Sequence, residues 1–387
     1  MLNGKKIIEI RKTGFVNKGA ELMLFAVLEK MQQSYSDAKF AMVPSSSISH
    51  APYTRRAKLG LYQKPHLLRR EGKFDWIWYL LPKNVRDMYG VVLNREVDVV
   101  MDAAGFAYSD QWGTVSCLEL AVSCKQWRKN GTKVVLLPQA FGPFKNWLNR
   151  KAIKIAFDHA DLVFARDKIS YDYLVEVVGE RPNLKLAPDF TNLIDGVVPD
   201  SFDKSSNRFC IVPNYRMVDK TSKVASEAYL PFMIEVTRYA YEKGQKPFIL
   251  VHEGANDLML AEEIRNAVSA EIQIIKETDP LKIKGILSVS SGTVGSRFHG
   301  LVSALSQGVP ALATGWSHKY QMLFEDYGFP EGLLEVTMSK NQIHSKLDLI
   351  TNEATKLDIS NKLKINSIRM KSEVEGMWRE IIETVNK

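Results

Sequence analysis

Short runs of apolar and β-branched residues recur along the chain, and each is followed by a polar or glycine-containing loop and then by a helical pattern. These runs are KIIEIR, VDVVMD, KVVLLP, DLVFA and LKLAP, then RFCIVP, PFILVHEG, IQIIKE, ILSVSS and VPALATG. Strands that alternate with helices are typical of parallel sheets with right-handed crossovers. The alternation therefore predicts an α/β fold.

A polar stretch, VVPDSFDKSSNR at residues 197–208, interrupts this rhythm, and we interpret it as a linker between domains. A chain of 387 residues is also too long for one ordinary core. We expect Rossmann-like domains at residues 1–198 and 207–387 that face each other across a cleft. The helical tail of the second domain is available to pack on the first. Ligands of such sheets bind beyond the carboxyl ends of the strands.

The charge balance favours anionic ligands, because 52 Lys and Arg outnumber 44 Asp and Glu. The densest basic stretch, at residues 53–70, lacks the interleaved aromatic residues of a nucleic-acid platform, so we expect no nucleic-acid partner. Leucines beside these charges are compatible with a helix that lies on a membrane surface. We therefore expect at most a peripheral contact with a membrane.

Cysteine usage and hydropathy indicate a cytoplasmic protein. The chain has three cysteines and no CxxC pair, which argues against a zinc site and suits a reducing compartment. We see no signal peptide and no apolar run near the ~20 residues that a membrane-spanning helix needs. The expected location is the cytoplasm, at most at the inner face of the membrane.

The stretch TVGSRFHGLVSALSQGVPALATG, residues 293–315, is the strongest candidate site. Gly295 permits a close backbone approach, Ser296 is a candidate N-cap, and a helix is expected to begin near Phe298. An arginine at such a helix start can hold a carboxylate or a phosphate, and a histidine there can titrate near neutral pH. We take Arg297 and His299 as catalytic residues. In the alternative interpretation, Arg297 forms an ion pair within its domain and His299 packs against the turn.

Further candidates lie in the loops that follow other strands. Arg166 is either a second anion clamp or part of an ion pair at a helix start, and Arg216 holds the matching place in the second domain. The complete set of predicted substrate-binding residues is Asn17, Gln139, Arg166, Arg216, His252, Gly295, Ser296, His318 and Lys319. We find no HExxH, GxSxG, Walker or GxGxxG motif, so neither a metal nor a nicotinamide cofactor is expected.

The run VGSRFHGLVSALSQGVPALATGWSHKY resembles the signature of the polysaccharide pyruvyl transferase family, in which S-R-x-H precedes a small-residue helix and G-x-P. Weaker segments occur in the family's order: N-x-G-x-E at Asn17, P-Q-x-x-G-P-F at residues 138–144, A-R-D-x-x-S at Arg166, and P-D at residues 188–189. One departure is DAAGFAY, which has only Gly105 where the family often has a glycine run.

The resemblance implies a GT-B-like fold and an enzyme of exopolysaccharide or cell-envelope biosynthesis. It implies that phosphoenolpyruvate donates a pyruvyl group to a sugar or a lipid-linked oligosaccharide, which forms a ketal and releases phosphate. His299 would then be the general acid, and Arg297 with Arg166 or Arg216 would hold the donor's charges. The scheme needs no cofactor.

Two alternatives remain. A nucleotide-sugar glycosyltransferase of the same fold carries two glutamates eight residues apart, which align with Gly295 and Ser303 here. The missing acids argue against the usual nucleotide-sugar site. A non-catalytic glycan-binding member is the other alternative, and the presence of both Arg297 and His299 speaks against it.

Overall fold

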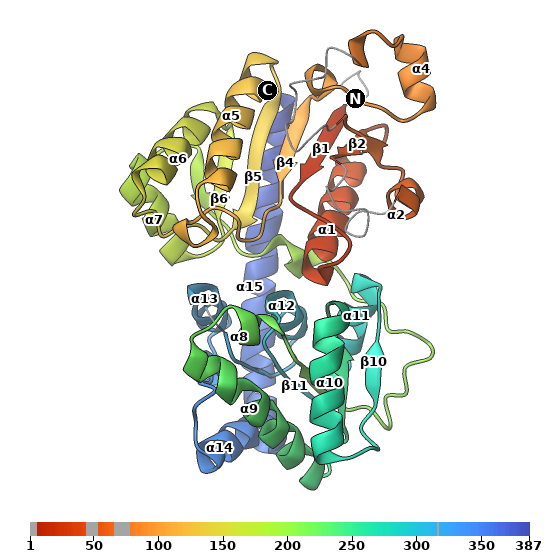
Figure 1. Cartoon of the computed structure of the whole chain (residues 1–387), viewed down its shortest axis with the longest axis vertical. Coiled ribbons are helices and arrows are strands. Elements are labelled where there is room, and N and C mark those ends of the chain that lie inside the picture. The colour runs from red at the N-terminus through yellow and green to blue at the C-terminus, as the bar shows by residue number, and fades with distance from the viewer. Residues whose placement is uncertain (1–5, 44–52, 66–77, 316) are drawn as a thin grey trace. The chain divides into compact units, whose positions relative to one another are not determined.

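The computed structural model describes residues 6–43, 53–65, 78–315 and 317–387, which form two compact α/β units (Figure 1). The first unit comprises Met1–Val16, Met23–Phe190 and Glu373–Lys387, and the second comprises Asn17–Leu22 and Thr191–Ser372. The first turn of helix α1 (Lys18–Ser34) therefore belongs to the second unit, and the last turns of α15 (Glu353–Asn386) belong to the first.

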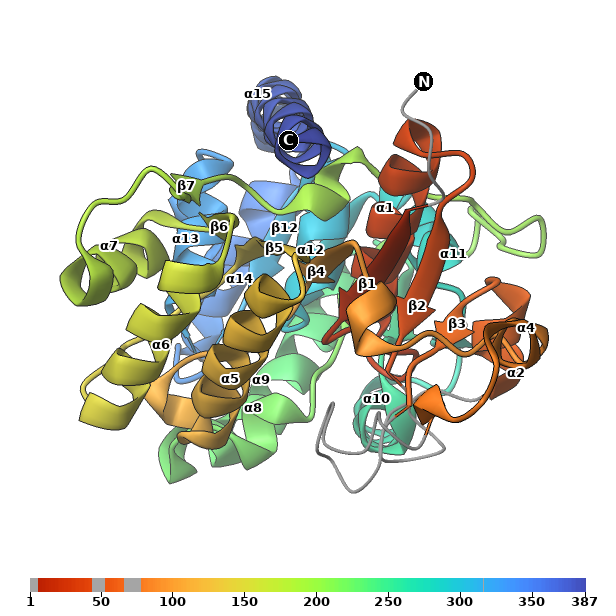
Figure 2. The same cartoon turned by 90° about the horizontal axis from the view of Figure 1, so that it is seen from above.

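In the first unit, parallel strands form a sheet in the order β3-β2-β1-β4-β5-β6-β7. The strands are β1 (Ile7–Arg11), β2 (Lys39–Met42), β3 (Tyr62–Gln63), β4 (Val99–Asp102), β5 (Lys133–Gln139), β6 (Leu162–Ala165) and β7 (Leu184–Leu186). The helices besides α1 are α2 (Tyr53–Lys58), α4 (Lys83–Met88), α5 (Val115–Lys129), α6 (Trp147–His159) and α7 (Lys168–Val178). Helices α5 and α6 cover one face of the sheet and α1 covers the other (Figure 2).

The second unit repeats this plan with the parallel order β10-β9-β8-β11-β12. Its strands are β8 (Phe209–Val212), β9 (Pro247–Val251), β10 (Ile274–Lys276), β11 (Gly292–Gly295) and β12 (Ala311–Ala313). Its helices are α8 (Arg216–Asp219), α9 (Lys223–Glu242), α10 (Gly254–Val268), α11 (Pro280–Ser288), α12 (Phe298–Leu305), α13 (His318–Asp326), α14 (Lys340–Thr351) and most of α15.

Residue alternation along the strands separates the two apolar layers of the second unit. Ile211 and Ile249 pack in one layer, while Val212 and Leu250 pack in the layer on α11. Strand order reverses between β8 and β11, which is the point where open α/β sheets bind ligands. The predicted α/β class with two Rossmann-like sheets is confirmed.

Two local predictions were wrong. The stretch 197–208 is not a free linker, because it belongs to the second unit: Val197 N donates to Leu281 O at 2.9 Å, and Gly196 packs against the backbone of Gly285. The chain passes from one unit to the other at Phe190–Thr191 instead. ILSVSS is not a strand, because α11, begun by Pro280 and capped by Asp279, extends through Ser288.

The basic stretch 53–70 does not form one continuous surface helix in its described part. It contains the short helix α2 and strand β3, and Lys64 is buried against Glu9 at 2.5 Å. Residues 66–70 lie outside the described residues. Elsewhere in the described ranges, no helix is both long and apolar enough to cross a membrane.

Candidate functional site

The loop after β11 is fixed from several sides through Ser296. Its hydroxyl accepts from Tyr229 Oη at 3.0 Å and lies 2.7 Å from Thr314 Oγ1. Its carbonyl accepts from Asn214 Nδ2 at 2.6 Å and from Tyr320 Oη at 2.9 Å. Ser296 is therefore committed to the scaffold. The prediction that it caps the helix was wrong, since Arg297 occupies the N-cap position and makes no side-chain capping bond.

Gly295 serves packing within the sheet. A Cβ at this position would lie 2.9 Å from Val212 Cβ and 3.1 Å from Val212 O on the neighbouring strand. Gly292 is similar, because a Cβ there would come within 2.8 Å of the Phe209 ring. The two glycines let β11 approach β8 closely at the centre of the sheet.

The guanidinium of Arg297 is held by two acids from the start of α10. Its Nε donates to Asp257 Oδ2 at 3.0 Å, its Nη2 contacts both Asp257 oxygens at 2.6 Å, and its Nη1 donates to Glu253. Burial works to lower the pKa of Arg297, but the charges of Asp257 and Glu253 outweigh it and the pKa is raised. The interpretation of Arg297 as an internal ion pair is thus what the structure shows.

Asp257 and Glu253 differ in how firmly they are placed. Asp257 is fully buried, and it also accepts from the backbone N–H groups of Tyr215 at 3.0 Å and Glu253 at 3.1 Å. The Glu253 side chain is 18% exposed, and its other hydrogen bond, from Asn17 Nδ2, is 3.3 Å long. Asp257 is therefore the fixed anchor of Arg297, and Glu253 is the looser partner.

His299 lies in the first turn of α12, against the first turn of α1. A Cβ at Gly19 would overlap the imidazole of His299. The α1 turn is held by Asn17, whose Oδ1 accepts from Gly19 N at 2.9 Å and Ala20 N at 3.1 Å. Asn17 was predicted to bind substrate. Its side-chain amide instead forms hydrogen bonds with this turn and with Glu253.

His252 follows β9 and is 5% exposed. Burial, with the positive charges of Arg297, His299 and Lys18 nearby, holds the pKa of His252 well below its usual range. Its Nδ1 is buried and has no hydrogen-bond partner among the residues that the structure describes. The side chain is therefore a neutral imidazole with a polar atom available to a ligand.

The starts of three helices thus meet at one place in the second unit. Lys18 opens α1, Gly254 opens α10 and Phe298 opens α12, and the side chains beside them contact one another. Helix N-termini present unpaired N–H groups and favour anions. The neighbouring charged side chains are paired, since Lys18 contacts the buried Glu21 at 2.7 Å and Arg297 contacts its two acids.

A family model described as polysaccharide pyruvyl transferase matches residues 17–318, a range that contains the starts of all three helices. The chain belongs to the polysaccharide pyruvyl transferase family. The match begins at Asn17, the residue that caps the α1 turn, and includes Arg297 and His299. Family membership supports a transferase that acts on a glycan.

Solved structures with a similar fold include proteins in complex with UDP or with a UDP-sugar. Anabaena HepE in complex with UDP and glucose is 13% identical with a TM-score of 0.58, over 99% of this chain and 100% of that one. A UDP-GlcNAc 2-epimerase from Neisseria meningitidis, bound to UDP-GlcNAc, is 10% identical with a TM-score of 0.59, over 98% and 99%. Staphylococcus aureus MnaA with UDP is 14% identical with a TM-score of 0.58, over 95% of both. These likenesses show the GT-B-like fold of this pyruvyl transferase family member.

Two predicted residues lie in the first unit. Gln139 is buried at the end of β5 and its Nε2 donates to Asp102 Oδ1 at 3.3 Å. Arg166, after β6, pairs with Asp189 at 3.3 Å and is 5% exposed. Asp167 caps α7 by accepting from Ser170 N at 2.7 Å. Arg166 therefore does form an ion pair, but with Asp189 rather than with an acid at the start of α7.

Three more predicted residues lie in the second unit. Arg216 is exposed and pairs with Asp219 at 2.7 Å, directed along its own short helix. His318 and Lys319 open α13, and the Lys319 ammonium lies 5.2 Å from the centroid of the Phe298 ring. Lys319 is thus placed beside the start of α12.

Sequence reasoning missed Lys18, Glu253 and Asp257. Glu253 and Asp257 stand four residues apart directly after β9, so they share one face of the first turn of α10. That spacing after a strand was the available signal. Lys18 had no local signal, because its proximity to His252 arises only when the α1 turn joins the second unit.

Proposed function

We propose that this chain transfers the pyruvyl group of phosphoenolpyruvate to two hydroxyls of one sugar in a glycan or glycan precursor, with formation of a ketal and release of phosphate. The observation that carries the proposal is the grouping of Arg297, His252 and His299 at the meeting point of three helix starts, inside the range that matches the family. Phosphoenolpyruvate is a small donor that carries both a carboxylate and a phosphate, and both suit helix N-termini.

One side of the Arg297 guanidinium is bound to a fixed carboxylate, and the other side is bound to a carboxylate that a ligand can replace. Asp257 holds Nε and Nη2 from a fully buried position, whereas the partly exposed Glu253 contacts Nη1. A donor carboxylate has the same chemistry as the Glu253 carboxylate. We therefore assign Glu253 as the group that the donor replaces at Nη1, so that Arg297 keeps its orientation while it exchanges one carboxylate for another.

The reaction divides into an addition and a substitution. In the first step one sugar hydroxyl adds to C2 of the donor, and C3 gains a proton and becomes a methyl group. In the second step the C2–O bond to phosphate breaks, the second hydroxyl bonds to C2, and its proton leaves with the phosphate or a nearby base. Each hydroxyl loses one proton, and the products are the ketal and inorganic phosphate.

The two histidines suit different parts of this scheme. His299 is partly exposed at the helix start and is our candidate for the acid that protonates C3. His252 is held neutral by its burial and its cationic neighbours, which suits it to accept a hydroxyl proton or a donor hydrogen bond. The positive group at the phosphate is proposed to be Lys319, beside the start of α12.

Purified protein incubated with phosphoenolpyruvate and a panel of sugar and lipid-linked acceptors tests the proposal. We expect phosphate release together with the acceptor mass gain of one ketal-linked pyruvyl group. His299→Ala should remove transfer while the protein stays folded by circular dichroism. Transfer from a UDP-sugar to the same acceptors, with no transfer from phosphoenolpyruvate, would instead establish a glycosyltransferase.

A further inference from the structure

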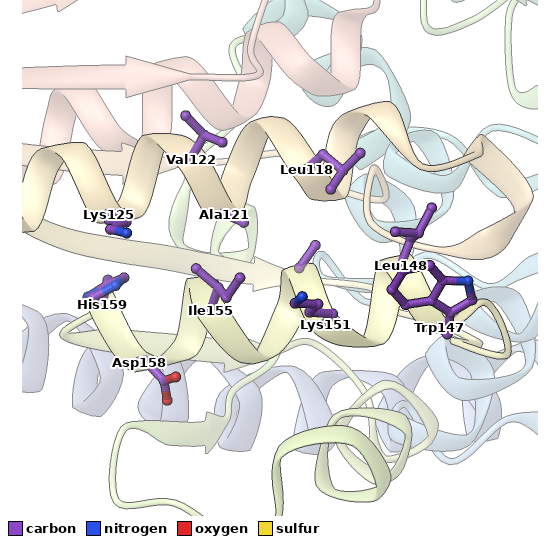
Figure 3. A pocket seen from close by; sticks show the side chains of 11 residues that line it. Leu118, Ala121, Val122, Lys125, Trp147, Leu148, Lys151, Ile155, Asp158 and His159 are labelled. Carbon is purple, nitrogen blue, oxygen red and sulfur yellow. The ribbon is translucent and has the colours of Figure 1, made fainter.

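Helices α5 and α6 of the first unit lie side by side (Figures 1 and 2) and enclose a groove of about 460 Å³ between them. Figure 3 shows Leu118 and Leu148 at one end of the groove and Lys125 and His159 at the other. Its walls are mostly apolar: Leu118, Ala121, Val122, Trp147, Leu148, Ala152 and Ile155. This groove, with Val115 beside it, is called the α5–α6 face below.

Several apolar side chains on this face point away from the core of the first unit. Helix α5 already buries one apolar stripe against the sheet, which includes Cys117, Leu120 and Cys124. A second stripe at i, i+3 and i+7 points outward, with Val115 75% exposed and Val122 71% exposed. Trp147 at the start of α6 is 68% exposed. Contiguous exposed apolar groups of this kind mark an interaction surface.

The charges on the α5–α6 face that have no ion-pair partner are positive. Lys125 and Lys151 line the groove, and neither forms an ion pair with any residue in the described part of the chain. The acid that lines the groove, Asp158, is paired with Arg181 at 2.6 Å. The face therefore complements an anionic surface.

We propose that the α5–α6 face docks on a membrane that contains anionic phospholipid. An exposed tryptophan beside aliphatic side chains suits the boundary between headgroups and acyl chains. Lys125 and Lys151 can extend their aliphatic stems along the groove and place their ammonium groups at the headgroup phosphates. Such docking brings the chain to lipid-bound sugars without a spanning helix, and it does not depend on which reaction the second unit performs.

Vesicle co-sedimentation of the full chain tests this proposal. The protein is mixed with vesicles of phosphatidylcholine alone or of phosphatidylcholine with phosphatidylglycerol, and we expect binding to the anionic vesicles that weakens with salt. The double variant Lys125→Gln/Lys151→Gln should bind roughly 25-fold more weakly, at about fivefold for each lysine. Val122→Glu should bind about tenfold more weakly or worse, because it places a carboxylate in the apolar stripe.

Matched controls separate this face from general stickiness. Val224→Glu changes a valine that is 66% exposed on α9, and Lys204→Gln/Lys276→Gln removes two exposed lysines of the second unit. Both controls should bind as the parent does, and all variants should keep the parent melting temperature. Equal binding to neutral and anionic vesicles, equal losses in the controls, or no vesicle binding by the parent would each overturn the proposal. So would a dimer of the parent that Val122→Glu converts to a monomer, because a second copy would then occupy the face.

Discussion

The Cα of Gly19, in the first turn of α1, lies against the imidazole of His299, in the first turn of α12. A side chain at position 19 would occupy the space of that ring. The orientation of the proposed acid thus depends on a glycine that stands far from it in the sequence.

Gly19→Ala should therefore lower transfer from phosphoenolpyruvate by roughly tenfold or more, since a small displacement of a catalytic group is costly. Helix α1 itself tolerates alanine, so the secondary structure by circular dichroism should not change. Gly376→Ala is the matched control, because a Cβ there comes no closer than 3.7 Å to the Arg379 guanidinium. Full activity of Gly19→Ala would show that the ring position does not matter.

Glu253→Gln should tighten the binding of phosphoenolpyruvate. The carboxylate competes with the donor for Nη1 of Arg297, and the amide competes less well. We expect KM for phosphoenolpyruvate to fall by roughly threefold to tenfold, equal to about 1 kcal/mol. Steady-state kinetics and calorimetric titration measure this change. Glu263→Gln, at an exposed position on the same helix, should leave KM as it is, and a raised KM in Glu253→Gln would contradict the exchange.

Asp257→Asn should lower the free energy of unfolding by about 3–5 kcal/mol, which is the usual cost of removing one partner of a buried ion pair. Asp257 is fully buried, and it holds both Arg297 and two backbone N–H groups. Urea unfolding monitored by fluorescence gives the free energy of unfolding. A loss below about 1 kcal/mol would mean that the pair contributes little. Glu253→Gln is an internal comparison and should lose much less, because its side chain is 18% exposed.

His252 should make the protein less stable in mild acid. Its pKa in the folded state is well below its usual range, so the unfolded chain binds more protons as the pH falls. The stabilisation is complete above a pH of about 6.5 and is lost below it, at a slope of up to about 1.4 kcal/mol per pH unit. In His252→Gln, the free energy of unfolding should depend less steeply on pH between pH 7 and 5. An unchanged slope in His252→Gln would contradict this account.

Local periodicity was sufficient to predict most of the architecture. Apolar runs such as KVVLLP became β5, and the helix expected near Phe298 begins at that residue. It failed at ILSVSS, where an Asp279 cap and Pro280 start a helix that periodicity alone cannot distinguish from a short buried strand. The strand that follows, GTVG, carries two glycines and has weak β propensity. Its pairing with the neighbouring strand β8, rather than its own residues, explains why it is a strand.

The sequence by itself determined the α/β class, the S-R-x-H segment with its resemblance to a family, and the placement of Arg297 and His299 at a helix start. Only the tertiary structure decided which charges meet. Arg297 contacts Asp257, His299 contacts Gly19, and the charge of Lys18 acts on His252. Each of these pairs joins segments that are far apart in the sequence. Parallel strands place all their carboxyl ends at one edge of the sheet, but local patterns carry no information about which side chains will pair there. For that reason the sequence predicted an open anion clamp at Arg297, and folding supplied the two acids that hold it.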